Sequence, residues 1–219
     1  MSDARNKILS RLRGQQPVIN ETERYTALKT ELPPASNLIE HFRSRMASVR
    51  AEVHLVSRDQ WPTKASALLK EKGLTKVLYA PETELGKTLH NSCSDDELSR
   101  LVSRTNSVAE WKEELFFDVD AAITSTKAGI AETGSLIVWP TAEEPRTWSL
   151  VPPVHIAILD AENLYATFSE AMQAGGWHKL MPTNQLLISG PSKSADIEQT
   201  LAYGVHGPTE LVVLLITET

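Results

Sequence analysis

The stretch Leu211-Val212-Val213-Leu214-Leu215-Ile216 is apolar at every position and decides the fold class. It is far shorter than the roughly 20 residues that a membrane helix needs, and its length suits a β-strand. An unbroken apolar run, in place of an alternating one, is typical of a parallel strand that helices cover on both faces. The stretch therefore predicts an α/β protein with a mainly parallel sheet.

Strands and helices alternate along the chain upstream of this stretch. The sequence pattern predicts strands at 52–57, 76–80, 117–125, 135–139, 155–160 and 186–189. It predicts helices at 38–49, 63–72, 84–90, 95–102, 107–115, 163–174 and 196–203. This alternation indicates β-α-β units, in which helices pack on the faces of a parallel sheet.

The N-terminal residues have a different pattern. Residues 2–13 predict a short helix, and residues 17–35 show little periodicity and carry Pro33-Pro34, which predicts an extended connector. We expect residues 1–35 to be an extension that packs on a single α/β domain spanning 36–219. The first seven residues are polar and lack the apolar core of a secretory signal, so we expect a cytoplasmic protein without a membrane span.

Charge and cysteine content limit the possible functions. The net charge of −6 argues against broad binding of a phosphate backbone, and no helix-turn-helix pattern is recognisable, which disfavours a nucleic-acid-binding regulator. Cys93 is the single cysteine of the sequence, so this chain alone cannot build a cysteine-ligated iron–sulfur cluster. The six histidines show no close ligand spacing, and no metal site is predicted.

Two candidate sites lie in the middle of the chain. Glu132 is the only acid in a small-residue turn that includes Gly134, and it is a candidate base or nucleophile; the alternative is a tight turn with a structural acid. Arg146 is a candidate clamp for a carboxylate or phosphate. His155 begins an apolar strand, and we interpret it as a core residue in preference to a catalytic group.

Two further candidates lie near the C-terminal end of the sequence. The loop from Gly190 leads into the predicted helix at 196–203, whose N-terminus would suit an anion. The proposed ligand-binding residues there are Gly190, Ser192, Lys193, Ser194 and Asp196. The alternative is simple helix capping by Ser194 and the acids. His206 lies in a Gly-Val-His-Gly-Pro loop, either exposed to a ligand or incidental to a helix C-cap.

These motifs form an ordered series. Ala131-Glu132-Thr133-Gly134-Ser135 is followed by Arg146-x-x-Ser149-Leu150-x-Pro152-x-x-His155-Ile156, then by Ile188-Ser189-Gly190-Pro191-Ser192-x-x-Ala195-Asp196-Ile197-Glu198 and by Gly204-Val205-His206-Gly207-Pro208. Over roughly residues 120–216 the series closely resembles the LUD domain of the LutC/YkgG family. One departure is Ser194, where that family commonly has threonine. The resemblance implies a fold like the NagB/RpiA/CoA-transferase superfamily, a Rossmann-like three-layer sandwich.

The resemblance also implies a function. It implies a role in oxidising L-lactate to pyruvate alongside two iron–sulfur partner proteins, which would then hold the clusters. A first hypothesis is therefore an accessory subunit without a redox cluster of its own; its cofactor, if any, is left open. A second is a small-molecule enzyme acting on an anionic ligand, with Glu132 and His206 catalytic. Its pocket would combine Glu132, Arg146, the 190–194 loop and His206 beyond the carboxyl ends of the strands.

Overall fold

A computed structural model describes residues 2–14, 37–177, 179, 181–195, 201–203 and 206–218. The chain divides into two compact units, Met1–Leu32 and Pro33–Thr219, each of which is described by itself. In the first unit the described residues form helix α1 (Ser2–Gly14), which confirms the helix predicted at 2–13. The packing of residues 1–35 on the domain stays a prediction.

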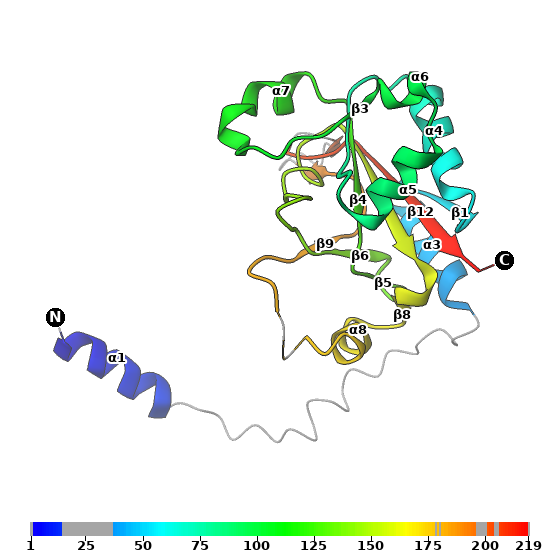
Figure 1. The fold of residues 1–219 in the computed structure, drawn as a ribbon. Helices are drawn as coiled ribbons and strands as arrows, with labels where there is room; N and C mark the ends of the chain where they lie inside the picture. The colour runs from blue at the N-terminus through cyan, green and yellow to red at the C-terminus, as the bar shows by residue number, and fades with distance from the viewer. Residues whose placement is uncertain are drawn as a thin grey trace. The chain divides into compact units, whose positions relative to one another are not determined.

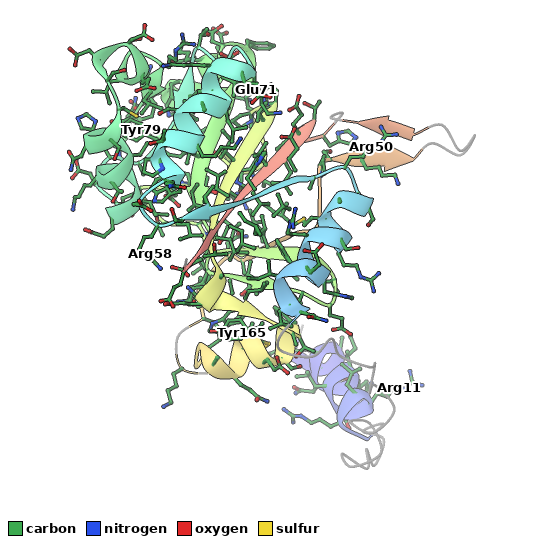
Figure 2. All side chains as sticks on the ribbon, turned by 90° about the vertical axis from the view of Figure 1, so that its right-hand side faces the viewer. Arg11, Arg50, Arg58, Glu71, Tyr79 and Tyr165 are labelled. Atoms are coloured by element: carbon green, nitrogen blue, oxygen red, sulfur yellow. The ribbon has the colours of Figure 1, made fainter. Side chains whose placement is uncertain are left out.

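The described part of the second unit is built around a six-stranded sheet, in which every neighbouring pair of strands is parallel (Figure 1). The strand order is β1 (Glu52–Ser57), β12 (Glu210–Thr217), β7 (Val154–Asp160), β4 (Ala121–Ser125), β2 (Val77–Leu78) and β3 (Leu101–Val102). Strand β1 forms one edge of the sheet, and Figure 2 shows Arg50 and Arg58 near its two ends. The predicted mainly parallel sheet is confirmed.

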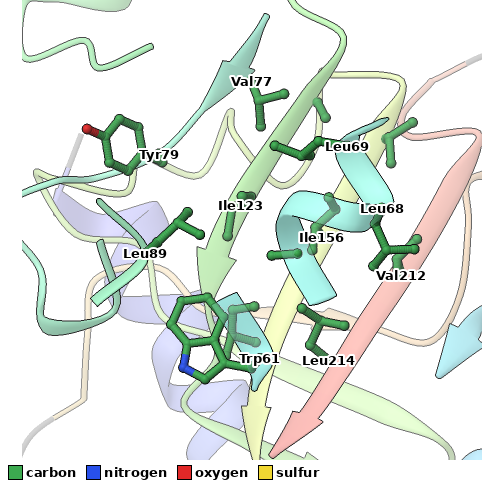
Figure 3. Packing of buried hydrophobic residues seen from close by; sticks show 14 of the residues in the cluster. Trp61, Leu68, Leu69, Val77, Tyr79, Leu89, Ile123, Ile156, Val212 and Leu214 are labelled. Carbon is green, nitrogen blue, oxygen red and sulfur yellow. The ribbon is translucent and has the colours of Figure 1, made fainter. Parts of the chain in front are cut away.

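Helices cover both faces of this sheet. Helices α4 (Trp61–Glu71) and α5 (Glu84–Ser92) pack on one face, where Trp61, Leu68 and Leu89 join the apolar cluster shown in Figure 3. Helix α3 (Leu38–Ser48) packs on the other face. Alternate residues of β12 enter the two clusters: Val212, Leu214 and Ile216 on the first face, and Leu211, Val213 and Leu215 on the second. This explains the unbroken apolar run and confirms the Rossmann-like sandwich.

A second, four-stranded sheet lies on the α3 side of the central sheet. Its order is β8 (Leu164–Tyr165), β5 (Ala128–Ile130), β6 (Ser135–Val138) and β9 (Leu186–Ile188), and it is antiparallel except between β5 and β8. Helix α8 (Phe168–Ala174) packs against it. The helix predicted at 163–174 is therefore too long, because Leu164 pairs in β8 after a short 3₁₀ turn, η3 (Ala161–Asn163).

The helix predicted at 196–203 is wrong at its C-terminal end. Residues Leu201–Tyr203 form strand β11, which pairs antiparallel with β10 (Lys193–Ala195), and residues 196–200 lie outside the described residues. The backbone of Ser194 is placed opposite Ala202 in this pairing. Cross-strand pairing overrides the weak local helix signal. The predicted anion site at 190–196 stays a prediction.

Short elements complete the domain: α6 (Asp95–Leu98), the 3₁₀ turn η2 (Val108–Glu110) and α7 (Lys112–Phe117). The helix predicted at 95–102 ends early because Leu101 pairs with Val77 of β2. The strand predicted at 117–125 begins only at Ala121. Just before it, the Asp120 carboxylate accepts hydrogen bonds from the backbone N–H groups of Thr75 and Lys76, at 2.8 and 3.0 Å. Among the described residues, no helix has the length and hydropathy to cross a membrane.

Candidate ligand cleft at the amino ends of the central strands

Three loops enclose a cleft of about 200 Å³. They are the segment before β7, the loop after β9 and the segment before β12, and they contribute Ser149, Leu150, Gly190, Ser192, His206 and Gly207 to its lining. His155 and Leu211, each at the amino end of a central strand, also line it. The cleft therefore lies at the amino ends of β7 and β12. We expected these loops to lie beyond the carboxyl ends of the strands, and the structure places them at the opposite end.

Glycine allows the three loops to approach one another. The N–H of Ser192 donates to the carbonyl of Pro208 at 2.8 Å. A Cβ on Gly207 would lie 3.2 Å from the Cβ of Ser192 and 3.3 Å from the carbonyl oxygen of Leu150. Any larger residue at 207 would require the neighbouring loops to shift by a few tenths of an ångström.

Gly190 has a different constraint. Its φ of +136° lies outside the range that residues with a Cβ usually adopt. A Cβ there would also lie 2.7 Å from a methyl carbon of Val49, at the end of α3. The loop after β9 can therefore turn toward the cleft only with glycine at this position.

The floor of the cleft contains a fully buried histidine. His155 is 0% exposed, and its Nε2 lies 2.8 Å from the hydroxyl oxygen of Thr124. Its Nδ1 is also buried and has no hydrogen-bond partner among the described residues. Burial lowers the pKa of His155 to about 4, so the ring is neutral at pH 7. The neutral ring therefore has one nitrogen without a partner among the described residues, in a residue that lines the cleft.

The sequence did not identify His155 as a site residue. A single polar residue in an apolar strand is its only local signal, and that signal also fits an ordinary core histidine. The unpaired Nδ1 and the contact with Thr124, 31 positions away in the sequence, became apparent only in three dimensions. His206, which was predicted, is exposed and lies among the residues that line the same cleft.

A row of hydroxyl groups connects the turn that holds Glu132 with the loop after β9. The hydroxyl oxygens of Thr133 and Ser135 are 2.7 Å apart, and those of Ser135 and Ser189 are 2.6 Å apart. Gly134 has a φ of +61°, and a Cβ there would lie 2.5 Å from the Cβ of Arg45. Gly134 thus allows the turn to pack against α3, and it is not among the residues that line the cleft.

The other predicted site residues lie elsewhere. Glu132 is half-buried in the turn between β5 and β6, and Arg146 is exposed; neither is among the residues that line the cleft. Lys193 is exposed at the start of β10. The side chain of Ser194 and the whole of Asp196 lie outside the described residues. The structure thus brings together Gly190, Ser192 and His206, and the roles given to Glu132 and Arg146 stay predictions.

The carboxyl end of β4 is closed by comparison, although a hollow of about 660 Å³ lies at the carboxyl ends of β1 and β12. The Glu144 carboxylate is 7% exposed and accepts hydrogen bonds from the N–H and the hydroxyl of Ser125, at 2.9 and 2.5 Å. Burial raises the pKa of Glu144, and the hydrogen bonds from Ser125 act in the opposite direction. The adjoining cavity is about 10 Å³, space for at most one water. In the part of the chain that the structure describes, no group of three or more potential ligand residues is arranged to hold a metal ion.

Comparisons with known proteins agree with this fold. The LUD domain profile matches residues 39–216. An uncharacterized protein of Neisseria meningitidis serogroup B is 38% identical over 182 residues, which cover 81% of this chain and 76% of the relative. A protein of Exiguobacterium named lactate utilization protein C is 31% identical over 137 residues, 56% of this chain and 59% of the relative.

A further relative and a solved structure extend the comparison. The Bacillus mycoides protein named lactate utilization protein C 1 is 25% identical over 179 residues, 78% of this chain and 75% of the relative. The crystal structure of a DUF162 family protein from Deinococcus radiodurans is similar with a TM-score of 0.62 at 20% identity. The similarity covers 84% of this chain and 100% of that one, and it shows that the two share a fold.

Proposed function

The chain belongs to the LUD domain family, and on that premise we propose that it acts in lactate utilization, as a component of the oxidation of L-lactate to pyruvate. Several relatives carry the name lactate utilization protein C. In this proposal, iron–sulfur partner subunits carry the redox centres. The chain itself serves in the cytoplasm as a ligand-binding or accessory subunit.

The cysteine content supports the proposal that partner subunits carry the iron–sulfur centres. An iron–sulfur cluster usually takes four cysteine thiolates, or two with two histidines, and the sequence contains Cys93 alone. Cys93 is partly buried beside the hydroxyl of Ser66, 3.4 Å away, and it packs against the apolar cluster under α4. Electron transfer through a cluster therefore requires a second protein.

The observation that carries a ligand-binding role is the unpaired Nδ1 of His155. Buried polar atoms in proteins are nearly always hydrogen-bonded, and this one belongs to a residue that lines a cleft. The hydroxyls of Ser149 and Ser192 and the imidazole of His206 add polar groups, while Leu150 and Leu211 add apolar ones. This mixture suits a small ligand that has a polar group directed toward the floor and an apolar part against the walls.

A second candidate function is a small-molecule enzyme that acts on an anionic ligand. The row of hydroxyls from Thr133 to Ser189 favours it, because it connects the turn that holds Glu132 to the loop that contains Gly190. In this version Glu132 is the base or nucleophile, His206 is the other catalytic residue, and Arg146 binds the anion. A ligand would have to extend from the cleft toward the turn.

Gene deletion tests the proposed function. Removal of this gene, with the partner genes intact, should abolish growth on L-lactate as the sole carbon source, and a plasmid copy should restore it. Growth on L-lactate at the normal rate without the chain would refute the proposal. Growth of both strains on pyruvate is the control, because pyruvate enters metabolism after the proposed step.

Thermal-shift measurements test the cleft. L-lactate, pyruvate, coenzyme A and sugar phosphates should be added separately to the purified chain, and a cleft ligand should raise Tm because it binds only the folded state. The variant His206→Ala should lose the shift. The matched control is His41→Ala on α3, which does not line the cleft and should retain it. An equal shift in both variants would exclude the cleft as the binding site, and no shift with any compound would favour an accessory role without a ligand.

A further inference from the structure

The two edges of the central sheet differ in how they are protected. One edge is β3, which is only two residues long, and a very short edge strand offers little backbone for another chain to pair with. The other edge is β1, whose six residues all pair with β12. Within the described ranges, no strand pairs with the outer side of β1.

Strand β1 has few of the features that usually block an edge: Glu52 is its one acidic side chain. Its sequence, Glu-Val-His-Leu-Val-Ser, contains no proline, glycine or lysine, and its ladder with β12 is regular from Glu52 to Ser57. Leu55, near the middle of the strand, is 44% exposed. Figure 2 faces this edge, with Arg50 and Arg58 labelled near its ends. A regular edge of this length, with an exposed leucine near its middle, is a template for pairing with another strand.

We propose that a second copy of this chain pairs with β1 in antiparallel orientation, so that two central sheets join across a two-fold axis. Such an interface uses the same surface on both copies, which is the commonest arrangement in homo-oligomers. The register that places the axis at Leu55 sets the two Leu55 side chains opposite each other. Each Glu52 then lies opposite Arg58 of the other copy, the residue that directly follows β1.

Charge complementarity selects this register. Oppositely charged side chains directly across an antiparallel pair stabilise it, and here the pairing of Glu52 with Arg58 occurs twice. If the axis lay between His54 and Leu55, Glu52 would face Ser57 and the ion pairs would be lost. The exposed Leu55 pair would bury apolar surface at the centre of the interface.

Both charged residues have capacity for a further partner. Within one copy, Glu52 accepts a hydrogen bond from Lys72 at 2.7 Å, and Arg58 pairs with Asp160 at 2.5 Å. Their side chains remain 45% and 62% exposed, respectively. A carboxylate accepts several hydrogen bonds and a guanidinium donates up to five, so intermolecular pairs can form without breaking the internal ones.

Light scattering coupled to size exclusion tests the proposal on the full chain. The measured molar mass of the wild type should be twice the 24.2 kDa of one chain. Leu55→Lys would place two ammonium groups opposite each other at the axis. Because like charges repel, we expect the dimer affinity to fall about tenfold or more. The matched control is Phe117→Lys on α7, which changes a side chain that is 84% exposed and should leave the dimer intact. A monomeric wild type, or a Leu55→Lys variant that remains dimeric, would overturn the proposal.

Disulfide formation tests the register. In a Cys93→Ser background, Leu55→Cys should cross-link two copies on mild oxidation, because opposite residues of antiparallel strands have Cα separations of about 4.5–5.5 Å, within disulfide range. In the same background, Val53→Cys should not, since the proposed register places residue 53 opposite Ser57. Cross-linking of Val53→Cys as readily as of Leu55→Cys would rule out this pairing.

Discussion

Glu144 and His155 are both buried, one near the carboxyl end of β4 and the other at the amino end of β7, and their surroundings differ. At the carboxyl ends, Glu144 has two hydrogen bonds from Ser125 and almost no empty space beside it. At the amino ends, His155 has one hydrogen bond, an unpaired Nδ1 and an adjoining cleft. Burial alone therefore does not mark a site in this protein. A buried nitrogen without a partner, in a residue that lines an open cleft, distinguishes the surroundings of His155 from those of Glu144.

Glycine substitutions should separate the closely packed surroundings of Glu144 from the open cleft at His155, with the largest expected effect. A Cβ on Gly86 would lie 1.7 Å from the carbonyl oxygen of Ala80, a backbone atom that cannot move aside. Gly86→Ala should therefore lower the free energy of unfolding by about 3 kcal/mol or more. Urea denaturation measures this difference.

The matched substitution at the open end is Gly207→Ala. Its Cβ would have contacts of 3.2–3.4 Å, which small shifts of the loops can relieve. We expect a loss below about 1 kcal/mol. Equal losses for Gly86→Ala and Gly207→Ala would show that the two glycines are packed equally tightly, which would contradict this difference.

The pH dependence of stability should show the effect of His155. Its pKa is lowered by burial from 6.5 to about 4, so the unfolded chain binds the proton more tightly between these values. Stability from this residue is present above pH 6.5 and is lost as the pH falls toward 4. The loss should reach about 2 kcal/mol by pH 5, at 1.36 kcal/mol per pH unit.

The variant His155→Gln isolates this contribution, because its side chain remains neutral. The difference in unfolding free energy between wild type and variant should decrease from pH 7 to pH 5, and subtraction removes the effect of the other acids and bases. A difference that does not change with pH would mean that His155 is not shielded from water as the structure shows.

Glu144 should show the opposite and smaller pH dependence. Burial raises the pKa of Glu144 above 4.5, so the folded state binds the proton more tightly and acidification relieves a cost that is present at neutral pH. The hydrogen bonds from Ser125 oppose the burial, which keeps the effect below that of His155. Relative to Glu144→Gln, the wild type should therefore gain stability as the pH falls from 7 to 4.5, as measured by urea denaturation at each pH. A relative loss would contradict the raised pKa.

The strength of local sequence signals explains which parts of the fold could be predicted. Strand β1 was predicted at 52–57, the residues it occupies, and the apolar run at 211–216 lies within β12. Both signals come from side chains that the core requires. Strand β5 was missed because Ala128-Gly129-Ile130 is short and contains glycine. A Cβ on Gly129 would lie 2.7 Å from a methyl carbon of Leu159, so the glycine serves close packing of the two sheets.

The cleft could be predicted only in part, for a related reason. Gly190, Ser192 and His206 were found because small and polar residues cluster in their loops, a signal that is local in sequence. The error at Leu201–Tyr203 arose because a strand pairing with β10 leaves no periodic pattern in so short a segment. Whether a buried nitrogen such as Nδ1 of His155 has a partner depends on contacts with distant residues, which no short motif encodes.

The position of β12 in the sheet has a consequence for folding. β12 pairs on one side with β7 and on the other with β1, whose residue Glu52 lies opposite Val212 across 160 positions of sequence. Contacts between such distant residues form late and slow folding, since a long loop must close first. During synthesis, which proceeds from the N-terminus, β1 leaves the ribosome long before its partner. Until β12 arrives, β1 has no partner strand in the sheet, and its apolar side chains depend on α3 and α4 for cover.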